Sequence, residues 1–156
     1  MTLDTFYSIV SASCFALVGL WWNVVAGHRE WFKDTAKRDA AGGIYLSFLI
    51  PAIMGLGSQI GGDNKLIWRA VFVLAALCGM IFTARLIVTT RALPGAGLFR
   101  QNQWLIIVLY AVVLAIALFP DLAPLIGLTG LQVEAITLCL LILIGHGLAW
   151  EFMTEA

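Results

Sequence analysis

Five apolar stretches, each long enough to cross a bilayer as a helix, dominate this sequence of 156 residues. The hydrocarbon core of a bilayer is about 30 Å thick and needs about 20 helical residues at 1.5 Å each. Inside it, only helices and closed barrels satisfy their own backbone hydrogen bonds. The stretches therefore predict an all-α, polytopic membrane protein, a bundle of five transmembrane helices. The predicted spans are residues 5–27, 43–61, 66–90, 103–119 and 131–151.

The composition agrees with a chain that lies in lipid. Hydrophobic residues make up 62% and charged residues 12%, which leaves too little polar surface to cover a soluble core of this size. We therefore expect one integral membrane domain over residues 1–156, multi-pass in the cell membrane, with the lipid bilayer as its first partner. The net charge is zero and no dense basic patch occurs, so nucleic acid is not expected as a partner.

The segments between the spans differ in chemistry. Residues 28–42 carry much of the charge, and within them residues 28–40 fit either an amphipathic helix on the inner leaflet or a solvated connector. Prolines bracket an apolar piece in residues 120–128, which predicts a short interfacial or re-entrant turn. Thr129 then stands where an N-cap of the fifth helix is expected.

Lysine and arginine predict the orientation, because cytoplasmic loops are enriched in them. Seven of the nine fall on the side of the loop at residues 28–42, and we place that side in the cytoplasm. The chain is then predicted to have its N-terminus outside and its C-terminus in the cytoplasm. The seven are Arg29, Lys33, Lys37, Arg38, Arg85, Arg91 and Arg100, and the other two are Lys65 and Arg69.

Small residues recur at helical spacing in three of the spans, which allows helix backbones to approach closely. Such a face packs helices within one bundle, or lines a pathway or a contact between subunits. The three faces are Ser8, Ala12 and Ala16, then Ser47, Pro51, Gly55 and Ser58, then Ala75, Gly79 and Thr83.

A first set of polar residues lies toward the cytoplasmic side of the predicted spans. His146, Asn23 and Arg85 reach similar depth on three helices, and polar groups at such depth seek one another or water. We expect His146 to form a hydrogen bond between helices, with titration or ligand binding as the alternative. Gly145 and Gly147 would let a neighbouring helix approach beside the ring.

A second set lies toward the outer side. Glu134 is one turn into the fifth span, Arg69 is one turn into the third, and Gln59 ends the second. An unpaired carboxylate in lipid is costly, so Glu134 should pair, take up a proton or face water. Arg69 is the nearest partner by depth, and we expect the two to be coupled, directly or through water. Of all residues in the sequence, Glu134 most strongly indicates a functional site.

No motif of a known chemistry is present. The sequence lacks a nucleophile elbow, a zinc-protease motif, a phosphate-binding loop and a potassium-channel filter. Its three cysteines form no CxxC pair, so no catalytic residues, cofactor or metal site are predicted. A bis-histidine haem would require His28 and His146 to face each other.

Three functions remain open from the sequence. The first is an oligomeric pore or transporter for a small solute or ion, in which Glu134, Arg69, His146, Arg85, Asn23 and Gln59 are the candidate pathway or buried polar residues. The second is an accessory or scaffold subunit that binds other membrane proteins through small-residue helix faces. The third is a membrane enzyme or haem carrier, which has the least support.

Overall fold

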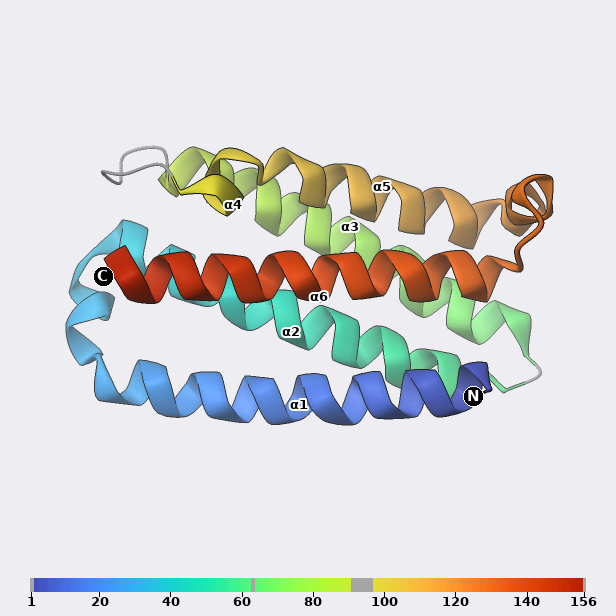
Figure 1. The fold of residues 1–156 in the computed structure, drawn as a ribbon, viewed down its shortest axis with the longest axis horizontal. Coiled ribbons are helices and arrows are strands. Elements are labelled where there is room, and N and C mark those ends of the chain that lie inside the picture. The colour runs from blue at the N-terminus through green and yellow to red at the C-terminus, as the bar shows by residue number, and fades with distance from the viewer. Residues whose placement is uncertain (1, 63, 91–96, 156) are drawn as a thin grey trace.

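The computed structural model describes residues 2–62, 64–90 and 97–155, and every regular element in these ranges is a helix (Figure 1). The long helices are α1 (Leu3–Gly27), α2 (Thr35–Gly61), α3 (Lys65–Thr90), α5 (Trp104–Leu118) and α6 (Gly130–Glu155). The short elements are η1 (Arg29–Lys33), α4 (Leu98–Gln101) and η2 (Pro120–Ile126), where η marks a 3₁₀ helix. The long helices lie side by side along one axis, and the two termini lie at opposite ends.

Four of these helices, α1, α2, α3 and α6, are long and apolar enough to cross a membrane. A fifth span exists only if α5 and η2 count as one broken span, because they are bent by 106°. The prediction of an all-helical bundle of membrane type is therefore confirmed, with four or five candidate spans. Large apolar side chains such as Leu20, Leu74 and Leu143 are exposed along the bundle, as lipid-facing residues would be.

Local hydrogen bonds explain where the helices begin. The Oγ1 of Thr129 accepts from the backbone N–H of Gln132 at 3.3 Å, and the Oε1 of Gln132 accepts from the N–H of Thr129 at 2.8 Å. This reciprocal pair is a capping box, which satisfies backbone donors at the start of α6. The predicted N-cap at Thr129 is confirmed.

The segment of residues 28–40 is divided between η1 and the first turns of α2. Asp34 caps α2, since its Oδ1 accepts from the N–H groups of Ala36 at 2.8 Å and Lys37 at 3.2 Å, and the helix continues from there into the apolar span. Trp31 in η1 is buried, stacked on Trp21 of α1. The Asp34 cap lets α2 begin within this charged segment, and the buried Trp31 holds the segment against α1. The segment therefore covers one end of the bundle.

Helix α2 lies at the centre of the bundle and contacts α1, α3 and α6. Against α1, the hydroxyl of Ser11 donates to the carbonyl of Ala52 at 3.0 Å, and a Cβ at Gly55 would lie 3.0 Å from the Cβ of Ser11. Gly55 therefore allows the close approach predicted for small residues in α2. In α1, however, the predicted face is not the one that packs.

The predicted small face of α1 is exposed. Ser8, Ala12 and Ala16 all lie on the outside of the bundle, while Tyr7 and Ser11 point inward. The neighbouring Tyr7 decides the orientation of α1, because burying an aromatic ring removes far more apolar surface from the solvent than burying alanines.

The predicted small face of α3 is buried as expected. Ala75 and Thr83 have little exposed surface, and Gly79 lies directly against the ring of Tyr110 in α5, so that a Cβ there would overlap the ring. These small residues let α5 approach α3 closely.

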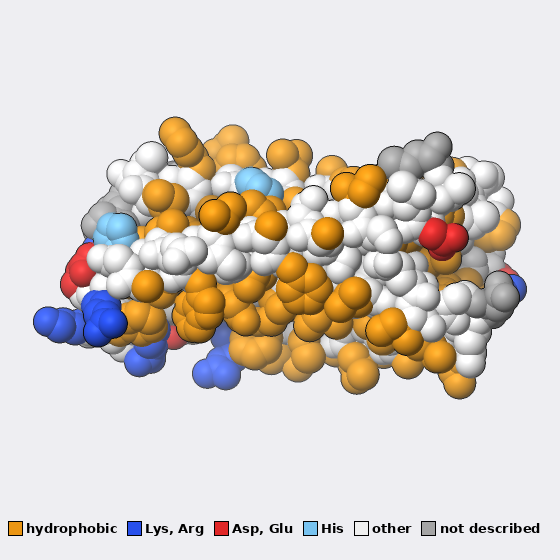
Figure 2. All heavy atoms as spheres, turned by 90° about the horizontal axis from the view of Figure 1, so that it is seen from below, with side chains coloured by type: hydrophobic (Ala, Val, Ile, Leu, Met, Phe, Trp, Pro, Cys, Tyr) orange, Lys and Arg blue, Asp and Glu red, His pale blue; other side chains and the backbone are white. Residues whose placement is uncertain are grey.

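Positive charge gathers at one end of the bundle (Figure 2). We call it the basic end; it is formed by the end of α1, η1, the starts of α2 and α5, and the ends of α3 and α6. Of the seven basic residues predicted for this side, Arg91 lies outside the described residues. The other six are Arg29, Lys33, Lys37, Arg38, Arg85 and Arg100.

Candidate functional site

Glu134 is the most unusual polar residue of the described chain. It lies one turn into α6, its exposed fraction is 0%, and neither of its carboxyl oxygens has a hydrogen-bond partner among the described residues. Leaving one buried polar group unsatisfied costs about 1–3 kcal/mol, and a charged group costs more. This uncompensated cost makes Glu134 the centre of the candidate site.

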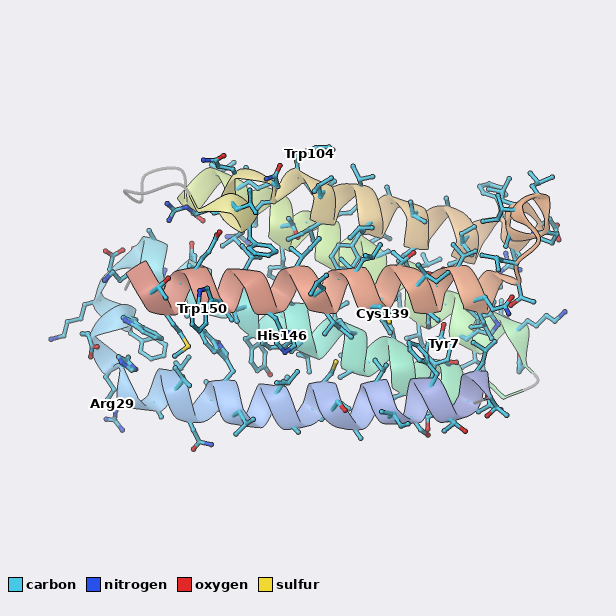
Figure 3. All side chains as sticks on the ribbon, viewed as in Figure 1. Tyr7, Arg29, Trp104, Cys139, His146 and Trp150 are labelled. Carbon is cyan, nitrogen blue, oxygen red and sulfur yellow. The ribbon has the colours of Figure 1, made fainter. Side chains whose placement is uncertain are left out.

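The neighbouring polar group is Tyr7 of α1, which is also fully buried and lies within electrostatic range of Glu134. Figure 3 shows Tyr7 reaching from α1 toward α6. Its hydroxyl donates to the backbone carbonyl of Leu131 at 2.7 Å, and its ring packs edge-on against Phe72 of α3. The Tyr7 hydroxyl is therefore hydrogen-bonded to a backbone carbonyl, and the Tyr7 side chain forms the wall of the site on the side of α1.

Arg69 does not form the ion pair with Glu134 that their equal depth predicted. Its Nε donates to the carbonyl of Ala117 at 2.6 Å and its Nη2 to the carbonyl of Leu118 at 2.7 Å. The last carbonyls of a helix have no partner within the helix and carry partial negative charge, which a guanidinium satisfies well. Arg69 therefore caps α5, and the direct pairing is wrong.

The chain bends sharply at the same end of the bundle. After α5, the 3₁₀ helix η2 turns away by 106° and ends at Gly127, whose φ of +73° is a left-handed conformation that glycine adopts readily. The segment predicted to form a short interfacial or re-entrant turn is thus a 3₁₀ helix bent away from α5. The start of α6 packs against it, since a Cβ at Gly130 would contact Ile116, Pro120 and Trp68.

Gln59 connects two helices near this end. The hydroxyl of Ser8 in α1 donates to its Oε1 at 2.7 Å, and its own Nε2 donates to the carbonyl of Gly55 at 3.1 Å. The bond to Ser8 joins α1 to α2, and the bond to Gly55 lies within α2. Neither bond involves Glu134.

The structure does not bring His146, Asn23 and Arg85 together, and all three are exposed. The Nδ1 of His146 lies 2.9 Å from the carbonyl of Ile142 in its own helix, and Asn23 likewise donates within α1. The predicted hydrogen bond between helices at His146 is wrong. His146 instead contacts the ring of Phe48 edge-on.

Two glycines explain the position of this histidine. Gly145 lies against Ser47 of α2, where a Cβ would come within 2.6 Å of the hydroxyl oxygen, and Gly147 lies against the ring of Phe99. The close approach predicted for both glycines is confirmed. The two glycines lie on the sides of α6 that pack against neighbouring elements. The ring of His146, between them in the sequence, is exposed.

His28 and His146 also have separate neighbours. His28 stacks on Trp31 with ring centroids 4.4 Å apart, at the basic end, whereas His146 lies against α2. This arrangement offers no support for a haem between them.

One carboxylate with a clear structural role is absent from the sequence-based interpretation. Glu151 of α6 accepts from the N–H groups of Phe99 at 2.7 Å and Arg100 at 2.9 Å, and thereby caps α4. Gly97 is needed there because a Cβ would overlap the Glu151 carboxyl. In the sequence, only Gly97 before the short helical segment indicates this cap. A glycine alone does not reveal that the capping carboxylate lies about 50 residues away.

Comparison with known protein families, with characterised proteins and with solved structures finds no match. The long apolar helices are compatible with a helical membrane protein.

Proposed function

We propose that this protein is a small multi-pass transporter of the cell membrane whose transported small ion is the proton, with Glu134 as the group that binds and releases it. The observation that carries the proposal is the complete burial of Glu134 without a hydrogen-bond partner in the described part of the chain. Ionisable residues inside membrane proteins are expensive and commonly mark ion pathways and proton relays. The free oxygens of Glu134 leave this carboxyl available to a proton.

The broken helix near Glu134 also supports transport. Discontinuous helices place backbone ends within the membrane at the binding sites of many transporters. Here the bend between α5 and η2 lies beside the start of α6, the helix that carries Glu134. A break of this kind allows one part of the bundle to move relative to another.

Orientation and assembly belong to the same proposal. The excess of lysine and arginine at the basic end places it in the cytoplasm by the positive-inside rule, with the N-terminus outside. Glu134 then lies in the outer half of the membrane. A bundle this small encloses no wide pore, so an oligomer would share the pathway between subunits.

One observation favours the accessory or scaffold function as a second candidate. The exposed face of Ser8, Ala12 and Ala16 on α1 continues to Gly19, where a Cβ would meet nothing within 4 Å. Small residues on an exposed helix face allow another transmembrane helix to pack closely. Such a face serves an oligomer of this chain or a contact with a different membrane protein.

Proton uptake into vesicles that contain the purified protein tests the transport proposal. With an imposed membrane potential and an entrapped pH indicator, the wild-type protein should acidify the vesicles faster than protein-free vesicles do. Glu134→Gln should reduce uptake to the protein-free rate, because the amide keeps the shape and carries no exchangeable acid. The matched control is Asp4→Asn, an exposed carboxylate near the same end, which should keep the wild-type rate.

Two results would contradict the proposal. Uptake by Glu134→Gln at the wild-type rate would remove Glu134 from the pathway. Uptake by the folded wild-type protein no faster than protein-free vesicles would leave the accessory function as the better account.

A further inference from the structure

A hollow of about 330 Å³ lies between α2 and α3 at the basic end. The exposed Arg38 and Arg85 form its charged part, and Leu46, Phe82 and Leu86 form its apolar part. We propose that this hollow binds one anionic phospholipid, with the phosphate at the two arginines and an acyl chain along the apolar part.

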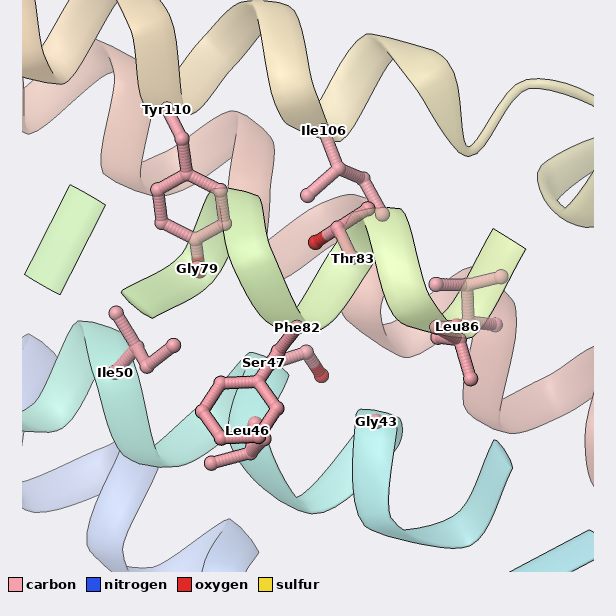
Figure 4. A pocket seen from close by; sticks show the side chains of 11 residues that line it. Gly43, Leu46, Ser47, Ile50, Gly79, Phe82, Thr83, Leu86, Ile106 and Tyr110 are labelled. Carbon is pink, nitrogen blue, oxygen red and sulfur yellow. The ribbon is translucent and has the colours of Figure 1, made fainter. Parts of the chain in front are cut away.

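A second cavity lies next to the hollow, deeper in the bundle. This smaller cavity of about 30 Å³ shares Gly43, Leu46, Phe82 and Leu86 with the hollow and reaches Ile50 of α2 (Figure 4). From Arg38 to Ile50 the distance is about 18 Å along the helix at 1.5 Å per residue. The hollow itself combines charged and apolar lining residues, and this combination fits an amphiphile.

The charges of the entrance fit a single phosphate. Arg85 has no ion-pair partner among the residues that the structure describes, while Arg38 forms an exposed ion pair with Asp39 at 3.7 Å. Two guanidinium groups against one carboxylate leave a net positive charge. Guanidinium groups bind phosphate oxygens in a bidentate manner, with bonds about twice as strong as neutral hydrogen bonds.

The position of the hollow favours a lipid over a free anion. Phe82 is partly exposed on the outside of the bundle, so the apolar part of the hollow is continuous with the surface that faces lipid. A free phosphate would use the arginines alone and would gain nothing from the apolar part. In the proposed orientation the entrance lies at the cytoplasmic leaflet, where anionic lipids are concentrated.

Two adjacent glycines shape the hollow in different ways. Gly43 allows Leu86 to approach, since a Cβ there would lie 2.6 Å from a methyl group of that side chain. Gly42 also lines the hollow, and a Cβ at this position would meet nothing within 4 Å. A larger side chain at position 42 would therefore fill the hollow without displacing protein atoms.

The test counts lipids bound to the full chain in detergent by native mass spectrometry, with dioleoyl phosphatidylglycerol and dioleoyl phosphatidylcholine as the probes. The wild-type protein should retain one phosphatidylglycerol selectively. Arg85→Gln should weaken this binding roughly tenfold, as expected for the loss of charge-assisted hydrogen bonds. Gly42→Leu should abolish it while all charges remain, and Arg38→Gln provides a second, independent charge variant.

Two matched controls separate a built site from general effects. Arg29→Gln removes an exposed charge of the basic end outside the hollow, and Gly19→Leu adds the same side chain in open space on α1. Both should bind phosphatidylglycerol as the wild type does. Melting curves recorded without lipid identify any variant that is not folded, and such a variant is replaced by the other variant of the hollow.

Several outcomes would overturn the proposal. Equal retention of phosphatidylcholine would remove the role of the arginines, and equal weakening by Arg29→Gln would show diffuse attraction only. Competition by inorganic phosphate, together with full binding by Gly42→Leu, would identify the site as one for a free anion. None of these outcomes bears on proton uptake through Glu134.

Discussion

Replacement of Gly79 by leucine should lower the free energy of unfolding by about 1–3 kcal/mol, the usual cost of overpacking a tight interior. Gly79 of α3 lies directly against the Tyr110 ring of α5, and any Cβ at this position would overlap the ring. Figure 4 shows the two residues facing each other. Tyr110 is itself buried, so the ring has little room to move, and the two helices must separate. Equilibrium unfolding in detergent micelles measures the change.

The same substitution at Gly19 is the matched control. This glycine lies on the exposed side of α1 with open space around it, so Gly19→Leu should not lower the free energy of unfolding and, through its higher helix propensity, should raise it by up to about 1 kcal/mol. In a Tyr110→Ala background the cost of Gly79→Leu should shrink, because the two residues share one contact. Equal losses for the two glycine variants would show that the packing of α3 on α5 is not tight.

Replacement of Glu134 by leucine should raise the free energy of unfolding by about 1–3 kcal/mol, because it removes a buried polar group that has no hydrogen-bond partner within residues 2–62, 64–90 and 97–155. A structural residue would show the opposite sign. The measurement is again equilibrium unfolding in micelles, with the proton-uptake assay run on the same preparation. A variant that is more stable and inactive would identify Glu134 as retained for function.

Glu151 supplies the comparison within the same helix. Its carboxylate caps α4 through two backbone N–H groups, so Glu151→Leu should destabilise the protein by about 0.5–2 kcal/mol, the range measured for helix caps. The two glutamates of α6 should therefore respond to one substitution with opposite signs. A loss at Glu134 equal to that at Glu151 would mean that Glu134 also has a structural partner.

The helices could be predicted because long apolar stretches leave the backbone few alternatives in lipid. The start of α6 could be predicted as well, since Thr129 and Gln132 form a local pattern. The start of α2 could not, because Lys37 and Arg38 made its first turns look like a loop. There a single cap at Asp34 extends the helix by two turns beyond the apolar stretch.

The candidate site could be predicted only in part, for a geometrical reason. Glu134 was identified because a charged residue within an apolar stretch is visible in the sequence. Depth along a helix, however, does not specify the direction in which a side chain points. Arg69 shares the depth of Glu134 but faces the end of α5, and His146 is turned outward by the glycines on either side of it.

The central claim is that Glu134 carries the transported proton, and a hydrophobic carbodiimide tests it most directly. This reagent enters the membrane and modifies buried carboxyl groups, and mass spectrometry gives the modified fraction of Glu134 at each time point. Proton uptake by the same vesicles should fall in proportion to that fraction, and Glu134→Gln should show neither uptake nor modification at residue 134. Wild-type uptake that persists when Glu134 is fully modified would contradict the claim.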